Sequence, residues 1–138
     1  MLTVTAGPFS FKGKLETERA PKTVAAFERL LPFHSKIIHV RWSGESAWIP
    51  LGDLDIGLDR APENATSHPA PGEVILYPGG VSETEILLAY GPTSFASKAG
   101  PLAGNHFMTI VGKLDRLAEL GRDTLWSGAK PVLFRQGT

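Results

Sequence analysis

The chain has 138 residues, of which 42% are apolar and 20% charged, which is the size of one domain with a single core. Fourteen basic residues balance fourteen acidic ones, so no long-range field attracts nucleic acid or an anionic membrane surface. The lack of cysteine excludes disulfides, thiolate nucleophiles and cysteine metal sites. With no visible signal peptide or membrane-spanning stretch, we expect one domain over residues 1–138, located in the cytoplasm.

The first third of the chain predicts strands followed by a helix. Residues 9–15 alternate apolar and polar side chains, which is typical of a half-buried strand, and Leu2 and Val4 indicate an earlier one. Pro21 suits the first position of a helix, because its missing N–H costs nothing there. The expected helix places one apolar face inward and ends at Pro32; this face contains Val24, Phe27, Leu30 and Leu31.

Residues 36–42 form the next expected strand. We predict that Ile38, Val40 and Trp42 face the core, while Ile37, His39 and Arg41 face outward. Residues 46–51 give another short strand, and residues 53–71 are predicted to form a long surface loop rich in Pro, Asn, Asp and Gly.

The second half predicts more strands and a second helix. The pattern predicts strands at residues 73–77 and 83–91, joined by a turn at residues 78–82. It predicts a further strand at residues 105–111. A helix then follows from the spacing of Leu114, Leu117, Ala118, Gly121 and Leu125, and the last strand covers residues 131–134. About seven or eight strands with mostly local connections, together with two helices, indicate a mainly β closed barrel with helices at its ends.

Two resemblances support this prediction. The segment FKGKLETERAPKTVAAFERL resembles the second strand and first helix of cyclophilins. The segments RWSGESAWIPLGDLD, PGEVILYPGGVSETEILLAYG and FASKAGPLAGNHFMTIVG resemble DUF3830, a family of bacterial cyclophilin-like proteins of unknown function. The resemblance implies a closed cyclophilin-like β-barrel with about two helices capping its ends, and it leaves the activity open.

Cyclophilins carry their catalytic surface on the outer face of the barrel, and the match there is partial. Arg41 resembles the cyclophilin arginine, Trp48 falls near an aromatic position, and residues 102–106 reproduce the spacer that leads to a histidine, here His106. Leu51 falls about where a glutamine is expected, and Pro101 replaces a pocket tryptophan. These losses argue against prolyl isomerase activity.

The candidate site residues come from polar and aromatic side chains on the expected outer face. Arg41 could clamp an anion through its planar guanidinium, or it could be an ordinary surface cation. Glu83 and Glu85 share one strand face and could form an acid/base pair, or they could be a solvated strand edge. Glu45 is a further polar candidate, while Trp48 and Tyr77 could wall a pocket.

His106 is the expected acid/base group, with Asn105 beside it, although a structural histidine at a strand start is an equal alternative. The four histidines lack metal-ligand spacing, so we predict no metal site; they are His34, His39, His68 and His106. Ser97 and Lys98 could form a serine nucleophile and its base, but no supporting motif surrounds them.

We therefore expect a protein that binds a small polar ligand, either a carboxylate or a cyclic amide, on the outer barrel face and without a cofactor. Glu83 and His106 are the predicted catalytic residues if a reaction occurs. The ligand-binding residues are predicted to be Arg41, Glu45, Trp48, Tyr77 and Asn105. Two alternatives stay open: an isomerase or hydrolase, including a residual prolyl isomerase, and an interaction module that forms a homo-oligomer.

Overall fold

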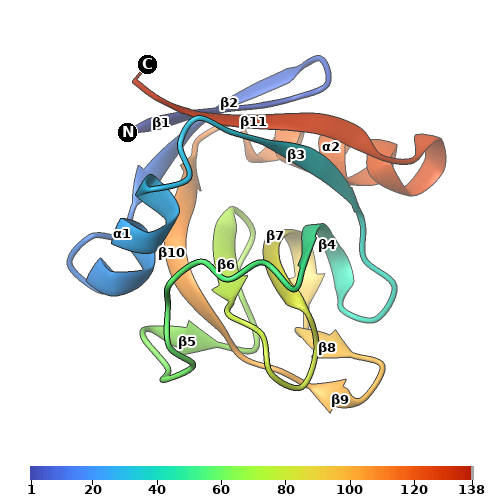
Figure 1. Cartoon of the computed structure of the whole chain (residues 1–138). Coiled ribbons are helices and arrows are strands. Elements are labelled where there is room, and N and C mark those ends of the chain that lie inside the picture. The colour runs from blue at the N-terminus through green and yellow to red at the C-terminus, as the bar shows by residue number, and fades with distance from the viewer. Residues whose placement is uncertain (138) are drawn as a thin grey trace.

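The predicted β-barrel is confirmed by the computed structural model of the chain, which describes residues 1–137. Figure 1 shows its strands curving around one core, with the two termini close together. The elements in chain order are β1 (Leu2–Ala6), β2 (Phe9–Leu15), α1 (Pro21–Glu28), β3 (Phe33–His39), β4 (Gly44–Gly52), β5 (Ala65–Thr66), β6 (Glu73–Tyr77), β7 (Thr84–Thr93), β8 (Ala96–Ser97), β9 (Gly100–Pro101), β10 (Gly104–Val111), α2 (Leu114–Ser127) and β11 (Lys130–Gln136).

Eight strands of residues 1–137 close the barrel, in the order β2, β1, β11, β3, β4, β7, β6 and β10. All of their pairings are antiparallel, and β10 pairs with β2 to close the sheet, with Met108 opposite Leu15. Closure leaves no long exposed edge that could pair with another chain. The short β5 adds to β10, and β8 and β9 form a separate hairpin.

Helix α1 closes one end of the barrel and begins at Pro21, as predicted. Its N-cap residue, Ala20, has no capping side chain, and Glu63 from the long loop takes that role by accepting hydrogen bonds from the N–H groups of Lys22 (3.1 Å) and Thr23 (2.8 Å). Phe27 is fully buried, and its ring centroid lies 5.0 Å from that of Phe107. The helix ends at Glu28, earlier than predicted, and the two leucines that follow it are half-buried against the core.

Helix α2 covers the opposite end, and its buried residues are Leu117, Leu120, Gly121 and Thr124. Gly121 permits close packing, because a Cβ at this position would overlap the ring of Tyr90 on β7. The helix predicted from the spacing of its apolar residues is confirmed, although Leu114 and Leu125 are 46% and 51% exposed. They lie at the two ends of the helix, beyond the part that packs against the barrel.

The predicted core face of β3 is wrong. Ile37 is only 2% exposed, whereas Ile38 is 38% and Trp42 56% exposed. Residues 37–40 are apolar on both faces apart from His39, so the polarity pattern alone does not decide which face turns inward. His39 is accommodated on the inner side because its Nε2 lies 2.7 Å from the hydroxyl of Tyr90.

The barrel interior is filled by side chains. The space that remains there is about 10 Å³ and is lined by apolar groups, so it is at the lower limit for one water molecule and offers that water no polar partner. A ligand site must therefore lie on the outside of the barrel.

Candidate functional site

A second apolar cluster covers part of the outer barrel face, where the strands are apolar on both sides. Val74 and Leu76 of β6 point into the core, while Ile75 and Tyr77 of the same strand point outward. The outward residues pack with others brought by β7 and by the segment around the β8–β9 hairpin; the cluster contains Ile75, Tyr77, Leu87, Phe95 and Leu102. Val40 and Trp48 are half-buried against it, so this face offers an apolar floor.

A cavity of about 160 Å³ opens beside this cluster. Its volume is well above the roughly 10–15 Å³ that one ordered water molecule needs, so the cavity has room for a small organic molecule. The walls come from the segment after β3, from β4, from the start of β7 and from the β8–β9 hairpin. The polar and aromatic groups among the lining residues include Arg41, Ser43, Trp48, Ser82, Glu85 and Lys98.

Glu85 is the buried acid of this cavity. It is 6% exposed, and within residues 1–137 its carboxyl group has no hydrogen bond or ion pair to another side chain or to the backbone. Burial, followed by the nearby charge of Glu83, raises the pKa of Glu85 to about 8. Glu85 is therefore mainly protonated at neutral pH and can act as a hydrogen-bond donor or release a proton to solvent.

Arg41 and Lys98 supply positive charge to the same cavity, and both side chains are exposed. The ion pairs of the described residues are His106–Glu73, Arg116–Glu119 and Lys130–Asp123, so neither cation is paired with a carboxylate. An unpaired arginine and lysine beside an apolar wall form a favourable place for an anionic group.

Of the predicted binding residues, the structure places Arg41 and Trp48 in this cavity. Glu83 is exposed and lines a neighbouring shallow depression, which shares Ser82 with the cavity. Glu45 is exposed and lies against Gly91. Tyr77 belongs to the outer apolar cluster, and its hydroxyl accepts a hydrogen bond from the N–H of Val81 at 3.0 Å.

Asn105 is buried and its side chain holds other parts of the fold together. Its side chain is 3% exposed, accepts a hydrogen bond from the N–H of Glu63 (3.1 Å) and donates one to the hydroxyl of Thr23 (3.1 Å). Thr23 in turn donates to the carboxylate of Glu63 at 2.8 Å, so the three residues form a closed ring that anchors α1. The structure does not place Asn105 in the cavity.

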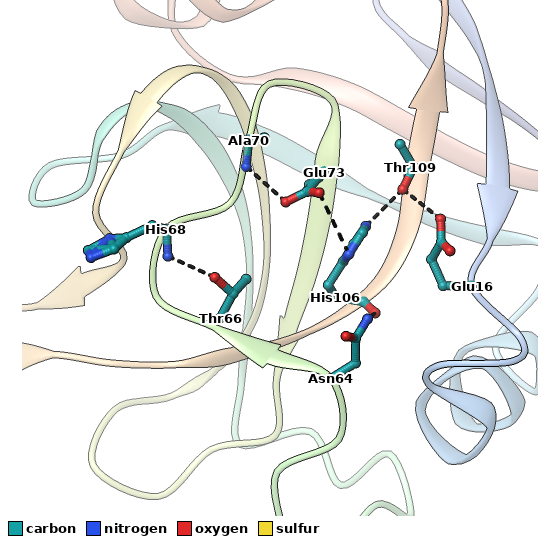
Figure 2. A network of polar contacts seen from close by, with 8 residues as sticks. All are labelled: Glu16, Asn64, Thr66, His68, Ala70, Glu73, His106 and Thr109. Atoms are coloured by element: carbon teal, nitrogen blue, oxygen red, sulfur yellow. Dashed lines mark hydrogen bonds and ion pairs between the residues drawn. The ribbon is translucent and has the colours of Figure 1, made fainter.

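His106 also lies outside the cavity, in the polar network of Figure 2. Thr109 donates its hydroxyl proton to Glu16 at 2.7 Å, so it must accept a hydrogen bond from Nε2 of His106 at 2.8 Å. Nδ1 of His106 faces Glu73 at 3.9 Å. A β-bulge between residues 106 and 108 shifts the register of β10 against β6 at this point, and the network links β10 to β6 and to the end of β2.

Two residues that line the cavity, Lys98 and Trp42, have roles in the sequence analysis that differ from the positions the structure gives them. The sequence suggests Lys98 only as a base for a Ser97 nucleophile. In the structure the hydroxyl of Ser97 accepts a hydrogen bond from the N–H of Ala99 (3.1 Å) and donates one to the carbonyl of Gly100 (3.4 Å), both within the β8–β9 turn. Trp42, predicted in the core, lines the cavity. The signal that could have located this hairpin is the pair of apolar residues that flank it, Phe95 and Leu102, because both pack onto the outer cluster.

The fold and the outer-face cavity define a cyclophilin-like β-barrel protein. The chain belongs to the DUF3830 family, described as proteins of unknown function, whose family model matches residues 2–135. Among curated proteins, none has a significantly similar sequence. No helix of residues 1–137 is long and apolar enough to cross a membrane, and those residues contain no group of three His, Asp or Glu side chains placed to hold a metal ion.

Two solved structures have a similar fold. One, described as McbB in complex with tryptophan, has a TM-score of 0.76 and 19% sequence identity, and the match covers 99% of this chain. This chain spans only 44% of the McbB chain. The other is the solution structure of the hypothetical protein AF2241 from Archaeoglobus fulgidus, with a TM-score of 0.64, 20% identity, and coverage of 99% of this chain and 93% of that one. At these identities the similarity shows the fold alone.

Proposed function

We propose that this protein binds a small carboxylate in the outer-face cavity. The observation that carries the proposal is the presence of two cations, Arg41 and Lys98, which line one cavity without a carboxylate partner in residues 1–137. Arg41 would hold the ligand carboxylate through its planar fork and Lys98 would add a second positive charge. Trp48 provides the apolar wall for the rest of the ligand.

The sequence leaves a carboxylate and a cyclic amide open as ligand chemistries, and the two cations favour the carboxylate. An uncharged cyclic amide would leave both cations without a counter-charge. McbB, part of whose chain has a similar fold, was solved in complex with tryptophan, an amino acid that carries a carboxylate. This supports including free amino acids among the first ligands tested here.

A thermal-shift experiment tests the proposal. The probes are 3-phenylpropionate, 4-methylpentanoate and pyroglutamate, with 2-pyrrolidinone as a cyclic amide without a carboxylate. A ligand at ten times its dissociation constant should raise the melting temperature by about 5 °C. The shift should be lost in Arg41→Ala and reduced in Lys98→Ala, and it should persist in Lys36→Ala, which removes an exposed cation of β3 outside the cavity.

Two results would contradict the proposal. The first is stabilisation of the Arg41→Ala protein by these carboxylates as strong as that of the wild type. The second is equal stabilisation by 2-pyrrolidinone and pyroglutamate, because this would show that the carboxylate contributes nothing.

Prolyl isomerase activity is the less favoured alternative. Leu51 is half-buried and Pro101 is exposed on β9, so neither position supplies the glutamine or the tryptophan of a cyclophilin proline pocket. We expect no acceleration of cis–trans isomerisation in a proline-containing test peptide, and a rate that increases with protein concentration would overturn this expectation.

A further inference from the structure

The polar groups of the cavity divide into those bonded within the protein and those left for a ligand. The hydroxyl of Ser43 donates to the carbonyl of Ala96 (3.2 Å) and accepts from its N–H (3.0 Å), which holds the hairpin in place. Ser97 is bonded within its own turn. The groups available to a ligand are therefore mainly charged or titratable: Arg41, Lys98 and Glu85.

The two cations line the same cavity as Glu85 but make no ion pair with it. Across residues 1–137, no nitrogen of Arg41 or Lys98 comes within 4.0 Å of the Glu85 carboxyl oxygens. The pKa of Glu85 is raised first by burial and then by Glu83, and neither cation acts to lower it. A ligand that satisfies both the cations and Glu85 needs one group for the cations and a different group for the carboxyl.

We infer that the ligand of this cavity is a zwitterion, a free amino acid or close analogue with an apolar side chain, whose carboxylate meets Arg41 and Lys98 and whose ammonium group meets Glu85. This assignment rests on the proposed function, because it describes the other end of the same ligand. Glu85 supports it, since its side chain lines the cavity and makes no hydrogen bond or ion pair within residues 1–137, and its carboxyl oxygens remain accessible to a ligand. The apolar side chain would contact the apolar residues that line the cavity, which are Val40, Trp42, Trp48 and Ala96.

The protonation state of Glu85 gives this assignment a measurable signature. A neutral carboxyl group can accept a hydrogen bond through its carbonyl oxygen, but the positive charge of an ammonium ion favours the carboxylate, so a bound ammonium group should lower the pKa of Glu85 and displace its proton. Because the pKa of Glu85 is about 8, most Glu85 side chains carry that proton at pH 7, and binding should release about one proton to the buffer. The ligand keeps its own ammonium proton throughout.

Calorimetric titration with matched probes tests the inference. Phenylalanine is compared with 3-phenylpropionate, which lacks the amino group, and with phenethylamine, which lacks the carboxylate. Leucine, 4-methylpentanoate and isopentylamine form a second set with a smaller apolar side chain. A charge-assisted hydrogen bond strengthens binding by roughly tenfold to hundredfold. Deprotonating Glu85 at pH 7 reduces this gain in affinity by about tenfold, because the pKa of Glu85 is about 8. We expect the amino acids to bind up to about tenfold more tightly than the acids at pH 7, with a larger ratio at pH 8.

Titrations in two buffers with different ionisation enthalpies report proton release. The wild type should release about one proton per bound amino acid at pH 7 and none per bound 3-phenylpropionate. Glu85→Gln should abolish both the proton release and the preference for the amino acid, while it retains binding of 3-phenylpropionate. Glu28→Gln, which changes an exposed glutamate of α1 outside the cavity, should keep both.

The outcomes separate this inference from the proposed function. If the acids bind as tightly as the amino acids at pH 8, or if no proton is released at pH 7, the zwitterion is ruled out and carboxylate binding stands. If Glu85→Gln still releases the proton, the role of Glu85 is ruled out. If neither acids nor amino acids bind, the proposed function fails and this inference fails with it.

Discussion

The side chains of Glu83 and Glu85 lie two residues apart where β7 begins, and the charge of the exposed Glu83 raises the pKa of the buried Glu85. The larger cause of the shift is the burial of Glu85 itself. The two acids, which the sequence predicts as an acid/base pair, therefore differ in environment, since Glu85 is buried and Glu83 is exposed. Glu85 lines the candidate cavity, and Glu83 acts on it through space.

The shifted pKa of Glu85 predicts how folding stability depends on pH. Its folded-state pKa of about 8 lies above the ordinary value of 4.5, so its stabilising contribution is complete below about pH 4.5 and is lost as the pH rises through 8. Between these values the unfolded chain releases the proton while the folded chain keeps it, which lowers stability by roughly 1 kcal/mol per pH unit. Glu85→Gln removes this dependence.

Urea unfolding of the wild type and Glu85→Gln from pH 4.5 to 8.5 measures the effect. The difference in unfolding free energy should grow in favour of the variant by a few kcal/mol up to about pH 8 and then level off. Glu28→Gln serves as the matched control and should follow the wild type. A difference that is constant with pH would mean that Glu85 is ionised in the folded protein.

Removal of the neighbouring charge should lower the pKa of Glu85. Glu83→Gln eliminates the second cause of the shift and leaves burial, so the pKa of Glu85 should decrease but stay above 4.5. NMR titration of the side-chain carboxyl carbon of Glu85 measures the pKa directly. An unchanged pKa in Glu83→Gln would show that the two carboxyl groups do not interact.

Much of the fold could be predicted from the chain because local patterns and tertiary structure agree in most elements. The alternation in β2 and Pro21 at the start of α1 both predict correct elements. The inner face of β3 is mispredicted, because Ile37 and Ile38 are equally apolar and the histidine that follows them finds a partner in Tyr90. Local polarity carries no information about such a distant partner.

The candidate site is less predictable, since it is assembled from segments far apart in the sequence. Arg41 and Trp48 could be proposed from the cyclophilin resemblance. The β8–β9 hairpin brings Lys98 to the cavity, and its position depends on packing of Phe95 and Leu102 against the outer cluster. The burial that distinguishes Glu85 from Glu83 likewise becomes visible only when the strands are paired.

The capping role of Glu63 predicts a loss of stability when its carboxylate is removed. Glu63 accepts hydrogen bonds from the N–H groups of Lys22 and Thr23 and from the hydroxyl of Thr23. Although partial burial acts to raise its pKa, these bonds dominate, and the pKa of Glu63 is lowered. Glu63→Ala should reduce the free energy of unfolding by about 1–2 kcal/mol at pH 7.

The contribution of Glu63 should also depend on pH. With a lowered folded-state pKa, it is present above the ordinary value of 4.5 and is lost as the pH falls through the folded value. Chemical unfolding at pH 7 and pH 3 compares Glu63→Ala with Glu18→Ala, which changes an exposed acid before α1. Equal stabilities of the two variants at pH 7 would show that the cap contributes nothing.

The close contact between Gly121 and Tyr90 predicts that Gly121→Ala destabilises the protein, although alanine favours a helix over glycine by about 1 kcal/mol. The added methyl group would overlap the tyrosine ring, which is also held by the hydrogen bond between its hydroxyl and His39. We expect a net loss of roughly 1–3 kcal/mol in thermal or urea unfolding. In a Tyr90→Ala background the overlap is absent, so the same substitution should be neutral or stabilising. A similar loss of unfolding free energy in both backgrounds would mean that the ring of Tyr90 does not limit the size of the side chain at position 121.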